Sequence, residues 1–425
     1  MTVAVFIFSL LGAMAIGLPI AFSLLVCGVA LMLYLGMFDA QILASNLLAG
    51  ADSFPLMAVP FFLLAGEFMN AGGLSRRIVN AAMAWIGHRR GGLGYVAVMA
   101  SIIMASLSGS AVADTAAVAA ILIPMMRDQG YNIGRSAGLI ASGGIIAPII
   151  PPSIGFVIFG VAGGVSITRL FMAGIFPGLL MGLSLVIAWW IVARREGIEP
   201  PPRQPMAVRL RTTVQGFWAF LLPVVIIGGL KMGVFTPTEA AVVAAVYSFV
   251  IGKFVYGELL WSDLYALILA AAKTTAAVLF LAAAAAVSAW LITIANIPAE
   301  VARLLQPFMG NDILLMFALM TIVVIIGTAL DFTPTILILT PVLMPVVKQA
   351  GIDPVYFGVL FIMNNAIGLI TPPVGTVLNV VAGVARIRVD DAVKGVWPFL
   401  VAQLVVLFLL VIFPELVLTP ARWLR

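Results

Sequence analysis

Charged residues are scarce in this sequence. Lys, Arg, Asp and Glu supply 9% of its 425 residues, whereas soluble domains carry about 25%. Hydrophobic residues supply 63%, and mean hydropathy is +1.21. A soluble chain of this size has no means of covering so much apolar side chain, whereas lipid does. The scarcity of charge therefore excludes a soluble globular protein.

Histidine and cysteine each occur once, and this narrows the chemistry. Cys27 has no partner for an internal disulfide, and its apolar neighbours indicate an inert thiol. His88 lies in the basic loop GHRRGG, which argues against a buried serine–histidine pair. The sequence also contains no HExxH motif. A membrane-embedded hydrolase is therefore disfavoured, and we expect no enzymatic activity.

Apolar runs fill most of the chain, and most are long enough to cross a bilayer, which takes roughly 17–25 residues. Several are longer, so they must tilt, break or fold back. We predict an all-α polytopic membrane protein with about ten to twelve crossings. The first run lacks a basic n-region, so we expect no cleavable signal peptide. The runs lie near residues 2–36, 93–126, 136–165, 170–193, 214–230, 236–252, 264–298, 312–347, 356–385 and 396–419.

The net charge of +5 comes from basic residues in short loops. This is the positive-inside pattern of a membrane protein, and we expect no nucleic-acid partner. The largest cluster is the proline-rich linker at 193–213, which also holds Glu196 and Glu199. A second basic segment spans 75–90. Both favour the cytoplasm, but no simple count of crossings satisfies every basic loop, so the orientation stays open.

The two halves of the chain repeat one pattern. The double prolines Pro151–Pro152 and Pro372–Pro373 lie 221 residues apart, and the same separation relates Pro124 to Pro345 and Gly174 to Gly395. Proline inside a helix removes a backbone donor and costs about 3 kcal/mol or more. Prolines kink many single transmembrane helices, but paired breaks at equal spacing are typical of secondary transporters. We predict two structural repeats, 1–213 and 214–425, with the second inverted relative to the first.

Each half has two such breaks, at 106–115 and 143–153 and at 325–335 and 364–375. Broken backbone in a membrane must line a cavity or bind a ligand. Carbonyl groups at the end of a half-helix suit a cation, and N–H groups at the start of the next suit an anion. Because hydroxyl and carbonyl oxygens suit sodium, we predict two pseudo-equivalent sodium sites.

Short polar side chains near the breaks each have two interpretations. Asp331 is either a functional intramembrane acid or a helix N-cap, and so is Asp114. Asn364 and Asn365 are either substrate ligands or interhelical contacts. Glu239, after Thr236-Pro237, is more simply structural, in the first turn of a helix.

Two further segments are candidates for re-entrant hairpins. Residues 53–74 have Pro60 near their centre, and the alanine-rich segment 275–298 is the corresponding stretch of the second half. Ordinary helix-packing faces rich in small residues remain the alternative.

Five motifs in order resemble the large membrane subunit of tripartite ATP-independent periplasmic (TRAP) transporters, nearly from end to end. They are GSAVADTAAVAAILIPMM, GYNIGRSAGLIASGG, IIPPSIGFVIFG, GVFTPTEAAVVAAVYSFVIG and NNAIGLITPPVGTVLNVVAGVA. The resemblance implies the ion-transporter-superfamily elevator fold, with scaffold and transport domains interleaved across both repeats. It also implies a multi-pass protein of the bacterial inner membrane, driven by two or more Na⁺ ions. The implied partners are a small four-helix membrane subunit and a periplasmic substrate-binding protein that delivers an organic acid.

The resemblance also implies site residues. The second sodium site falls on Gly327, Gly368, Thr371 and Val374, the last through its carbonyl. The first falls on Ser106, Ser108, Ser110, Gly144 and Pro151. In the repeat, Thr371 pairs with Ile150 and Gly368 with Ala147, so the two sites cannot match ligand for ligand. For the substrate we predict Asp331, Thr333, Asn364, Asn365 and Ser153.

Two other readings stay open at this point. A stand-alone sodium-coupled dicarboxylate-type carrier would need no binding protein, and a passive channel does not exclude duplicated breaks. The identity of the organic acid is not encoded in any motif of this chain.

Overall fold

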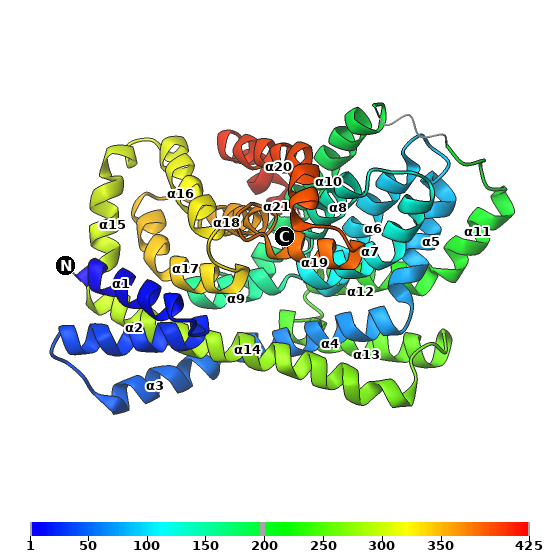
Figure 1. Cartoon of the computed structure of the whole chain (residues 1–425). Helices are drawn as coiled ribbons and strands as arrows, with labels where there is room; N and C mark the ends of the chain where they lie inside the picture. Colours follow the sequence, from blue (N-terminus) through cyan, green and yellow to red (C-terminus); the bar gives the residue numbers. More distant parts are fainter. Residues whose placement is uncertain (1, 196–199, 424–425) are drawn as a thin grey trace.

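The computed structural model describes residues 2–195 and 200–423, and within them the chain is helical throughout (Figure 1). Twenty-one α-helices and three short turns of 3₁₀ or π geometry form these residues. The all-α prediction is therefore confirmed. Glu196 and Glu199 of the linker lie outside the described residues.

The helices before the linker fall into two sets. The first five are α1 (Thr2–Ala15), α2 (Ile20–Tyr34), α3 (Ala40–Ala51), α4 (Ala58–Ala71) and α5 (Leu74–Ile86). The next five, which carry both breaks of the first half, are α6 (Gly92–Ser108), α7 (Ala111–Asp128), α8 (Ile133–Gly144), α9 (Ile154–Gly163) and α10 (Ile167–Ala193).

The helices after the linker follow the same plan. The first set is α11 (Met206–Gln215), α12 (Phe217–Lys231), α13 (Pro237–Val250), α14 (Trp261–Ile294) and α15 (Ile297–Leu305). The second is α16 (Asp312–Gly327), α17 (Phe332–Gln349), α18 (Pro354–Gly368), α19 (Thr376–Ala385), α20 (Val389–Ile412) and α21 (Glu415–Trp423). Helices α7 and α17 begin 221 residues apart, as do α8 and α18. Each half thus carries a broken segment at the corresponding place.

Among the described residues, six helices are long and apolar enough to cross a membrane alone. A seventh crossing arises if α11 and α12, which meet at a bend of 52°, form one span. The other apolar helices have 10–17 residues, and many of them adjoin a break. The predicted ten to twelve crossings require such short helices to pair across their breaks, and that number stays a prediction.

The predicted re-entrant hairpins at 53–74 and 275–298 were wrong. The first segment runs from a 3₁₀ turn at Phe54–Met57 straight into α4. Pro60 lies in the first turn of that helix, where the missing N–H costs little. The second segment is part of the 34-residue helix α14, as expected for alanine, the residue with the highest helix propensity.

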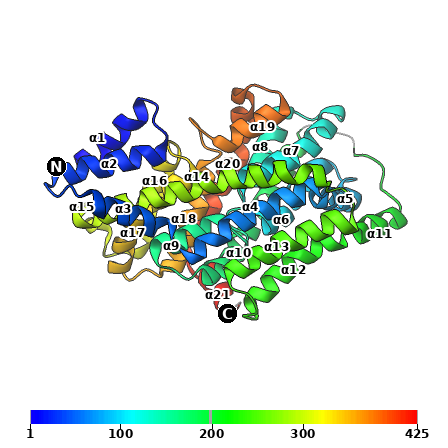
Figure 2. The ribbon, with the colours of Figure 1, turned by 90° about the horizontal axis from the view of Figure 1, so that it is seen from below.

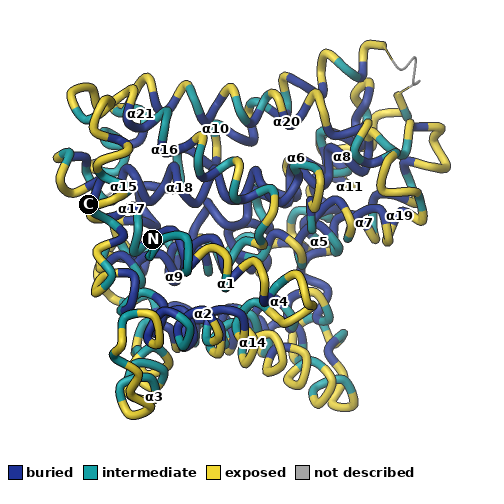
Figure 3. Tube along the Cα trace, turned by 60° about the vertical axis from the view of Figure 1, so that its left-hand side comes forward, coloured by how far each residue is buried: buried dark blue, intermediate teal, exposed yellow. Residues whose placement is uncertain are grey.

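A layer of long helices lies against a core of broken ones. Helix α14 packs along α2, α3 and α4, and α13 packs on α4. Figures 1 and 2 show these helices crossing one side of the molecule. The core helices exchange partners between the halves, since α9 packs on α17 and α19 packs on α7. Buried positions concentrate in the core helices, and the outer faces of α3 and α14 are exposed (Figure 3).

The described residues of the two basic segments, 75–90 and 193–213, lie on one face of the molecule. Arg90 donates a hydrogen bond to the Arg194 carbonyl at 3.4 Å, and the Trp85 indole donates one to Thr213 Oγ1 at 2.9 Å. The Arg209 guanidinium lies 5.7 Å from the Trp85 ring centroid. One orientation therefore satisfies both segments, and the positive-inside bias predicts that this face lies in the cytoplasm.

Candidate functional site

The first break separates α6 from α7 at Gly109–Ser110. Gly109 adopts a left-handed conformation (φ +64°), and the Ser110 side chain caps α7 by accepting a hydrogen bond from Ala113 N. Ser108, the last residue of α6, donates to Asp114 Oδ1 at 2.5 Å and accepts from Ser110 N. The chain thus turns on two serines and reaches a buried acid one helical turn later.

Asp114 is not the N-cap of its helix, which corrects that alternative. Ser110 occupies the cap, and Asp114 lies within the first turn, 2% exposed. Its second oxygen, Oδ2, has no hydrogen-bond partner, and neither does the buried Thr115 Oγ1. An unpaired buried polar atom costs about 1–3 kcal/mol, and more when charged. Two such oxygens on one turn of α7 are the free ligands that a cation needs.

The end of α8 lies directly against this turn. A Cβ on Gly144 would lie only 1.7 Å from Thr115 Oγ1 and 3.1 Å from the Ala111 carbonyl oxygen. A larger residue at this position would displace the Thr115 side chain, so glycine lets α8 end close against α7. The carbonyl ends of α6 and α8 therefore both reach the first turn of α7, and the partial negative charge of a helix C-terminus favours a cation at this point.

The first double-proline loop packs onto the same break. A Cβ on Gly109 would lie 2.5 Å from the Pro152 carbonyl oxygen, so the two backbones are in contact. Pro151, joined to Pro152 by a cis peptide bond, is buried. Ser153 is also buried; it caps α9 by accepting from Phe156 N and donates to the Pro148 carbonyl.

The second break has a buried asparagine beside the ends of its half-helices. Asn365 of α18 is 1% exposed, and its Nδ2 donates to the Phe332 carbonyl at 2.7 Å. Its Oδ1 has no partner and would lie 3.5 Å from a Cβ on Gly327. A Cβ on Gly368 would lie 2.7 Å from the Gly327 carbonyl oxygen. The ends of α16 and α18 therefore meet as closely as backbone permits, beside a free amide oxygen.

The remaining predicted ligands of the second site lie in the loop after α18. Thr371 donates from Oγ1 to the Ile367 carbonyl at 2.8 Å and is half-buried. Val374 is exposed, and its carbonyl accepts a hydrogen bond from Asn379 Nδ2 at 2.8 Å. The Pro372–Pro373 peptide bond in this loop is also cis.

Asp331 is an N-cap in this structure, one of its two predicted roles. Its Oδ1 accepts from Phe332 N at 2.9 Å and from Thr376 Oγ1 at 3.4 Å, and the residue is exposed. Thr333 follows in the first turn of α17 and is half-buried. The carboxylate thus joins the starts of α17 and α19 at the surface of the second break.

The two breaks are joined through the core. A Cβ on Gly155 would lie 2.7 Å from the ring of Phe332, so the starts of α9 and α17 are in contact. Phe332 in turn is bound through its carbonyl to Asn365, while the Pro152–Ile154 backbone lies against Gly109. One strip of contacts therefore runs from the first break to the second.

Most predicted residues lie along this strip, but two are engaged elsewhere. Ser106 donates to the Ile103 carbonyl within its own helix, and Asn364 donates to the Met320 carbonyl at 2.6 Å, which joins α18 to α16. Glu239 completes a capping box with Thr236, which confirms its structural role. Sequence reasoning missed Thr115, whose only signal was its position directly after Asp114.

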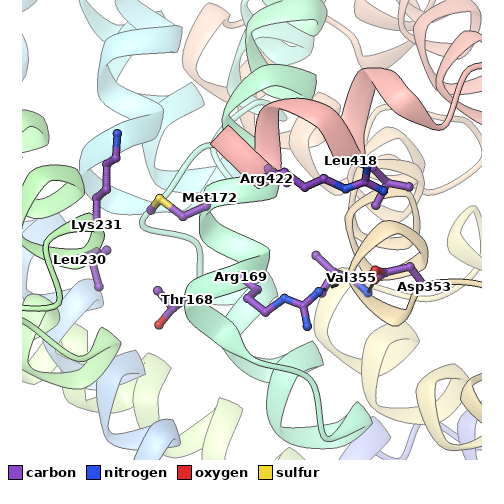
Figure 4. A pocket seen from close by; sticks show the side chains of 10 residues that line it. Thr168, Arg169, Met172, Leu230, Lys231, Asp353, Val355, Leu418 and Arg422 are labelled. Atoms are coloured by element: carbon purple, nitrogen blue, oxygen red, sulfur yellow. Dashed lines mark hydrogen bonds and ion pairs between the residues drawn. The ribbon is translucent and has the colours of Figure 1, made fainter. Parts of the chain in front are cut away.

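A small charged pocket lies on the face opposite the basic loops. It has a volume of 160 Å³ and is lined by residues from α10, α12, α18 and α21. Arg169 points toward Asp353, 3.7 Å away, while Lys231 of α12 points away from that pair (Figure 4). Small-molecule sites measure about 300–1,000 Å³, and this pocket contains no predicted ligand. It is therefore distinct from the helix breaks.

A larger cavity of 410 Å³ separates the helix layer from the core. Small side chains of α14 line one side, among them Ala282, Ala285 and Ala289, and α9 and α17 line the other. Asp52 and Ser53, before α4, are its polar residues. The broken core thus faces the layer across a smooth wall of alanines.

Paired half-helices that end at buried, unpartnered oxygens define a polytopic membrane protein of the secondary-transporter class. The comparisons with known proteins agree. The model of the DctM component of tripartite ATP-independent periplasmic transporters matches residues 7–416, and the chain belongs to this family. It is a multi-pass TRAP transporter permease subunit and not an enzyme, as predicted.

Relatives and a solved structure extend this finding. The chain is 57% identical, over the full length of both proteins, to the 2,3-diketo-L-gulonate TRAP transporter large permease protein YiaN of Escherichia coli (strain K12). It is 37% identical to the isethionate TRAP transporter permease protein DctMQ of Oleidesulfovibrio alaskensis, with 95% of this chain and 64% of that protein covered. The YdaH transporter of Alcanivorax borkumensis shares the fold, with a TM-score of 0.63, 15% identity and coverage of 88% and 89%.

Proposed function

We propose that this chain is the sodium-coupled membrane subunit of a TRAP transporter that imports an organic acid. The observation that carries the proposal is a group of buried oxygens at the breaks that have no hydrogen-bond partner, among them Asp114 Oδ2, Thr115 Oγ1 and Asn365 Oδ1. Sodium prefers hard oxygen ligands with little formal charge, and hydroxyl, amide and carbonyl oxygens supply them at both breaks.

The first sodium site, in this proposal, lies between the turn at Ser108–Ser110 and the end of α8. Asp114 and Thr115 supply side-chain oxygens, and the backbone around Gly144 supplies carbonyls. The Ser108 hydroxyl holds Asp114 Oδ1, so that Oδ2 is oriented for the ion. An intramembrane carboxylate is costly, and a bound sodium ion provides the counter-charge.

The second sodium site lies between Gly327 and Gly368, with Asn365 Oδ1, Thr371 and the Val374 carbonyl as further candidates. Asn365 is held by its hydrogen bond to the Phe332 carbonyl, which leaves the amide oxygen directed toward Gly327. Because no acid occurs at the corresponding position, this site would bind the ion through neutral dipoles alone.

The organic acid would bind where the helix N-termini meet. The starts of α9 and α17 are in contact, and Gly109, just before α7, lies on the loop that leads into α9. N-termini attract anions, so a carboxylate is favoured there. Thr333, Ser153 and Asp331 are the predicted contacts, with Asp331 suited to accept from a substrate hydroxyl. Asn364 and Asn365 would support this site from α18.

The core would carry ions and substrate together across the membrane as an elevator. The alanine wall of α14 and the 410 Å³ cavity support this, because small side chains would let the core helices slide past α14 with little steric hindrance. The two repeats, 1–213 and 214–425, would be inverted, so that one half can adopt the arrangement that the other leaves. The boundary between them falls within α11.

The partners are a periplasmic binding protein and a small membrane subunit. The matched family is tripartite, and the DctMQ relative continues well beyond the region that this chain matches. We infer that a separate small membrane subunit corresponds to the part of the DctMQ relative that this chain does not match. The identity to the diketogulonate permease makes sugar acids the first substrates to test.

The test is uptake into liposomes that contain this chain with its small subunit. We expect uptake of labelled 2,3-diketo-L-gulonate to require both the loaded binding protein and an inward sodium gradient. Uptake that proceeds equally without binding protein would indicate a stand-alone carrier. Uptake that ignores the sodium gradient would contradict sodium coupling and favour a channel.

A further inference from the structure

A long apolar groove lies between α6 and α10, beside the end of α5. Its volume is 770 Å³, and its walls include Val98, Met99, Ile102 and Ile103 of α6 and Val186 and Ile187 of α10. Met99 and Ile187 are 41% and 52% exposed. The groove extends at least from Tyr95 to Ile103, roughly 12 Å at 1.5 Å per residue. This shape fits an extended hydrocarbon chain.

The cytoplasmic end of the groove is cationic. Arg89 and Tyr95 line it, and the Arg194 guanidinium stacks 3.6 Å above the ring of Trp190, a third residue of the wall. Arg89 and Arg194 both lie close enough to the Tyr95 hydroxyl to interact with it electrostatically. Two guanidinium groups and one hydroxyl therefore surround the mouth of an apolar channel.

These cations have no counter-ion within the described part of the chain. Neither Arg89 nor Arg194 forms an ion pair with a described carboxylate. A further cation, Arg209, lies beside His88; it is 3% exposed, and its Nε and Nη2 have no hydrogen-bond partner. Unpaired buried cations are costly, so an external anion would stabilise this corner of the molecule.

We propose that the groove binds an anionic phospholipid of the cytoplasmic leaflet, with one acyl chain along α6 and the phosphate at Arg89, Arg194 and Tyr95. Charge complementarity selects this occupant, because basic pockets between transmembrane helices on the cytoplasmic side bind anionic headgroups. The lipid lies where α5 of the outer set meets α6 and α10 of the core.

Native mass spectrometry of the purified chain in equimolar phosphatidylglycerol and phosphatidylcholine, with identical acyl chains, tests the proposal. We expect wild-type protein to retain phosphatidylglycerol preferentially. Arg89→Ala/Arg194→Ala should lower that preference roughly thirtyfold, since each arginine at a lipid surface contributes a factor of about five. The exposed pair Arg195→Ala/Arg211→Ala is the matched control and should retain the wild-type preference.

A third variant, Met99→Trp, tests the groove itself. Met99 is exposed, so the larger side chain should fill the groove without disturbing the core, and retention of both lipids should fall. Soluble glycerophosphoglycerol should not displace the lipid, because it lacks the acyl chain. Equal retention of both lipids by wild-type protein would overturn the proposal. That result is expected if Glu196 and Glu199 neutralise the arginines. An equal loss in the control pair would also overturn it.

Discussion

The two helix breaks share a backbone plan and differ in side chains. At the first, α8 ends against the first turn of α7, just beyond the end of α6; at the second, α16 and α18 end against one another. At the first, Gly144 has no side chain, and the polar side chains come from α7, where Thr115 lies against Gly144 and Asp114 precedes it. At the second, the residue at the position of Gly144 is Asn365, which reaches from α18 toward Gly327.

The two halves therefore agree more closely in the positions of their helix ends than in the side chains beside those ends. A buried, hydrogen-bonded carboxylate serves the first break and a neutral amide the second. A charged ligand attracts an ion over a longer range than a dipole does, so the first site should bind sodium more tightly. Substitutions at the two sites should therefore differ in their effect on sodium dependence.

The largest effect is expected from Asp114→Asn. Removing the buried carboxyl group that would pair with the bound ion should lower sodium-dependent uptake about 100-fold, the loss of roughly 3 kcal/mol that a charged contact supplies. Asp331→Asn is the matched control at the second break. Because Asp331 is exposed, its replacement should raise the half-saturating substrate concentration about tenfold and leave that for sodium unchanged. Equal sodium phenotypes would contradict the assignment.

Gly144→Ala should be the next most damaging change. Its Cβ has no room beside Thr115 Oγ1, and overpacking of a core costs about 1–3 kcal/mol. A lower melting temperature in detergent, together with weaker sodium stabilisation, is the expected result. Gly327→Ala provides the comparison, since its Cβ would have 3.5 Å to Asn365 and should change the melting temperature little. A harmless Gly144→Ala would refute the close approach of α8 to α7.

Asn365→Ala and Asn364→Ala separate ligand from scaffold. The first removes the unpartnered amide oxygen that lies beside Gly327 and should raise the half-saturating sodium concentration for uptake about tenfold. The second removes a hydrogen bond to the Met320 carbonyl and should cost about 1–3 kcal/mol of stability with unchanged sodium dependence. A changed sodium dependence in Asn364→Ala and an unchanged one in Asn365→Ala would contradict these roles.

Thr371→Val should have the smallest effect. The threonine hydroxyl already donates to the Ile367 carbonyl, so its lone pairs would contribute one ligand of several. We expect the half-saturating sodium concentration to rise about threefold in flux measurements. Thr376→Val, which removes a long hydrogen bond to Asp331, is the control and should leave it unchanged.

The positions of the breaks could be predicted from the sequence because proline and glycine act locally on the backbone. The spacing of 221 residues therefore matched the double-proline loops of the two halves, and the predicted breaks at 106–115 and 325–335 contain the starts of α7 and α17. Side-chain partners depend on which helices meet in space, and no local rule encodes that. Hence Thr115 was missed, Asp114 was considered as a cap, and a proline in a first turn was read as a hairpin at 53–74.

That the two basic segments lie on one face could be learned only from the structure. In the sequence, 75–90 and 193–213 are separated by five core helices, and their relative placement depends on how many crossings intervene. The contacts of Arg90 with Arg194 and of Trp85 with Thr213 resolve this.

Equilibrium sodium binding to the purified chain tests the central claim most directly. Titration of wild-type protein with NaCl against KCl at constant ionic strength, followed by calorimetry, should reveal sodium-specific binding at two sites. Asp114→Asn should remove the tighter site and Asn365→Ala the weaker one. Binding that does not distinguish sodium from potassium, or that survives both substitutions together, would contradict the assignment of the two helix breaks as sodium sites.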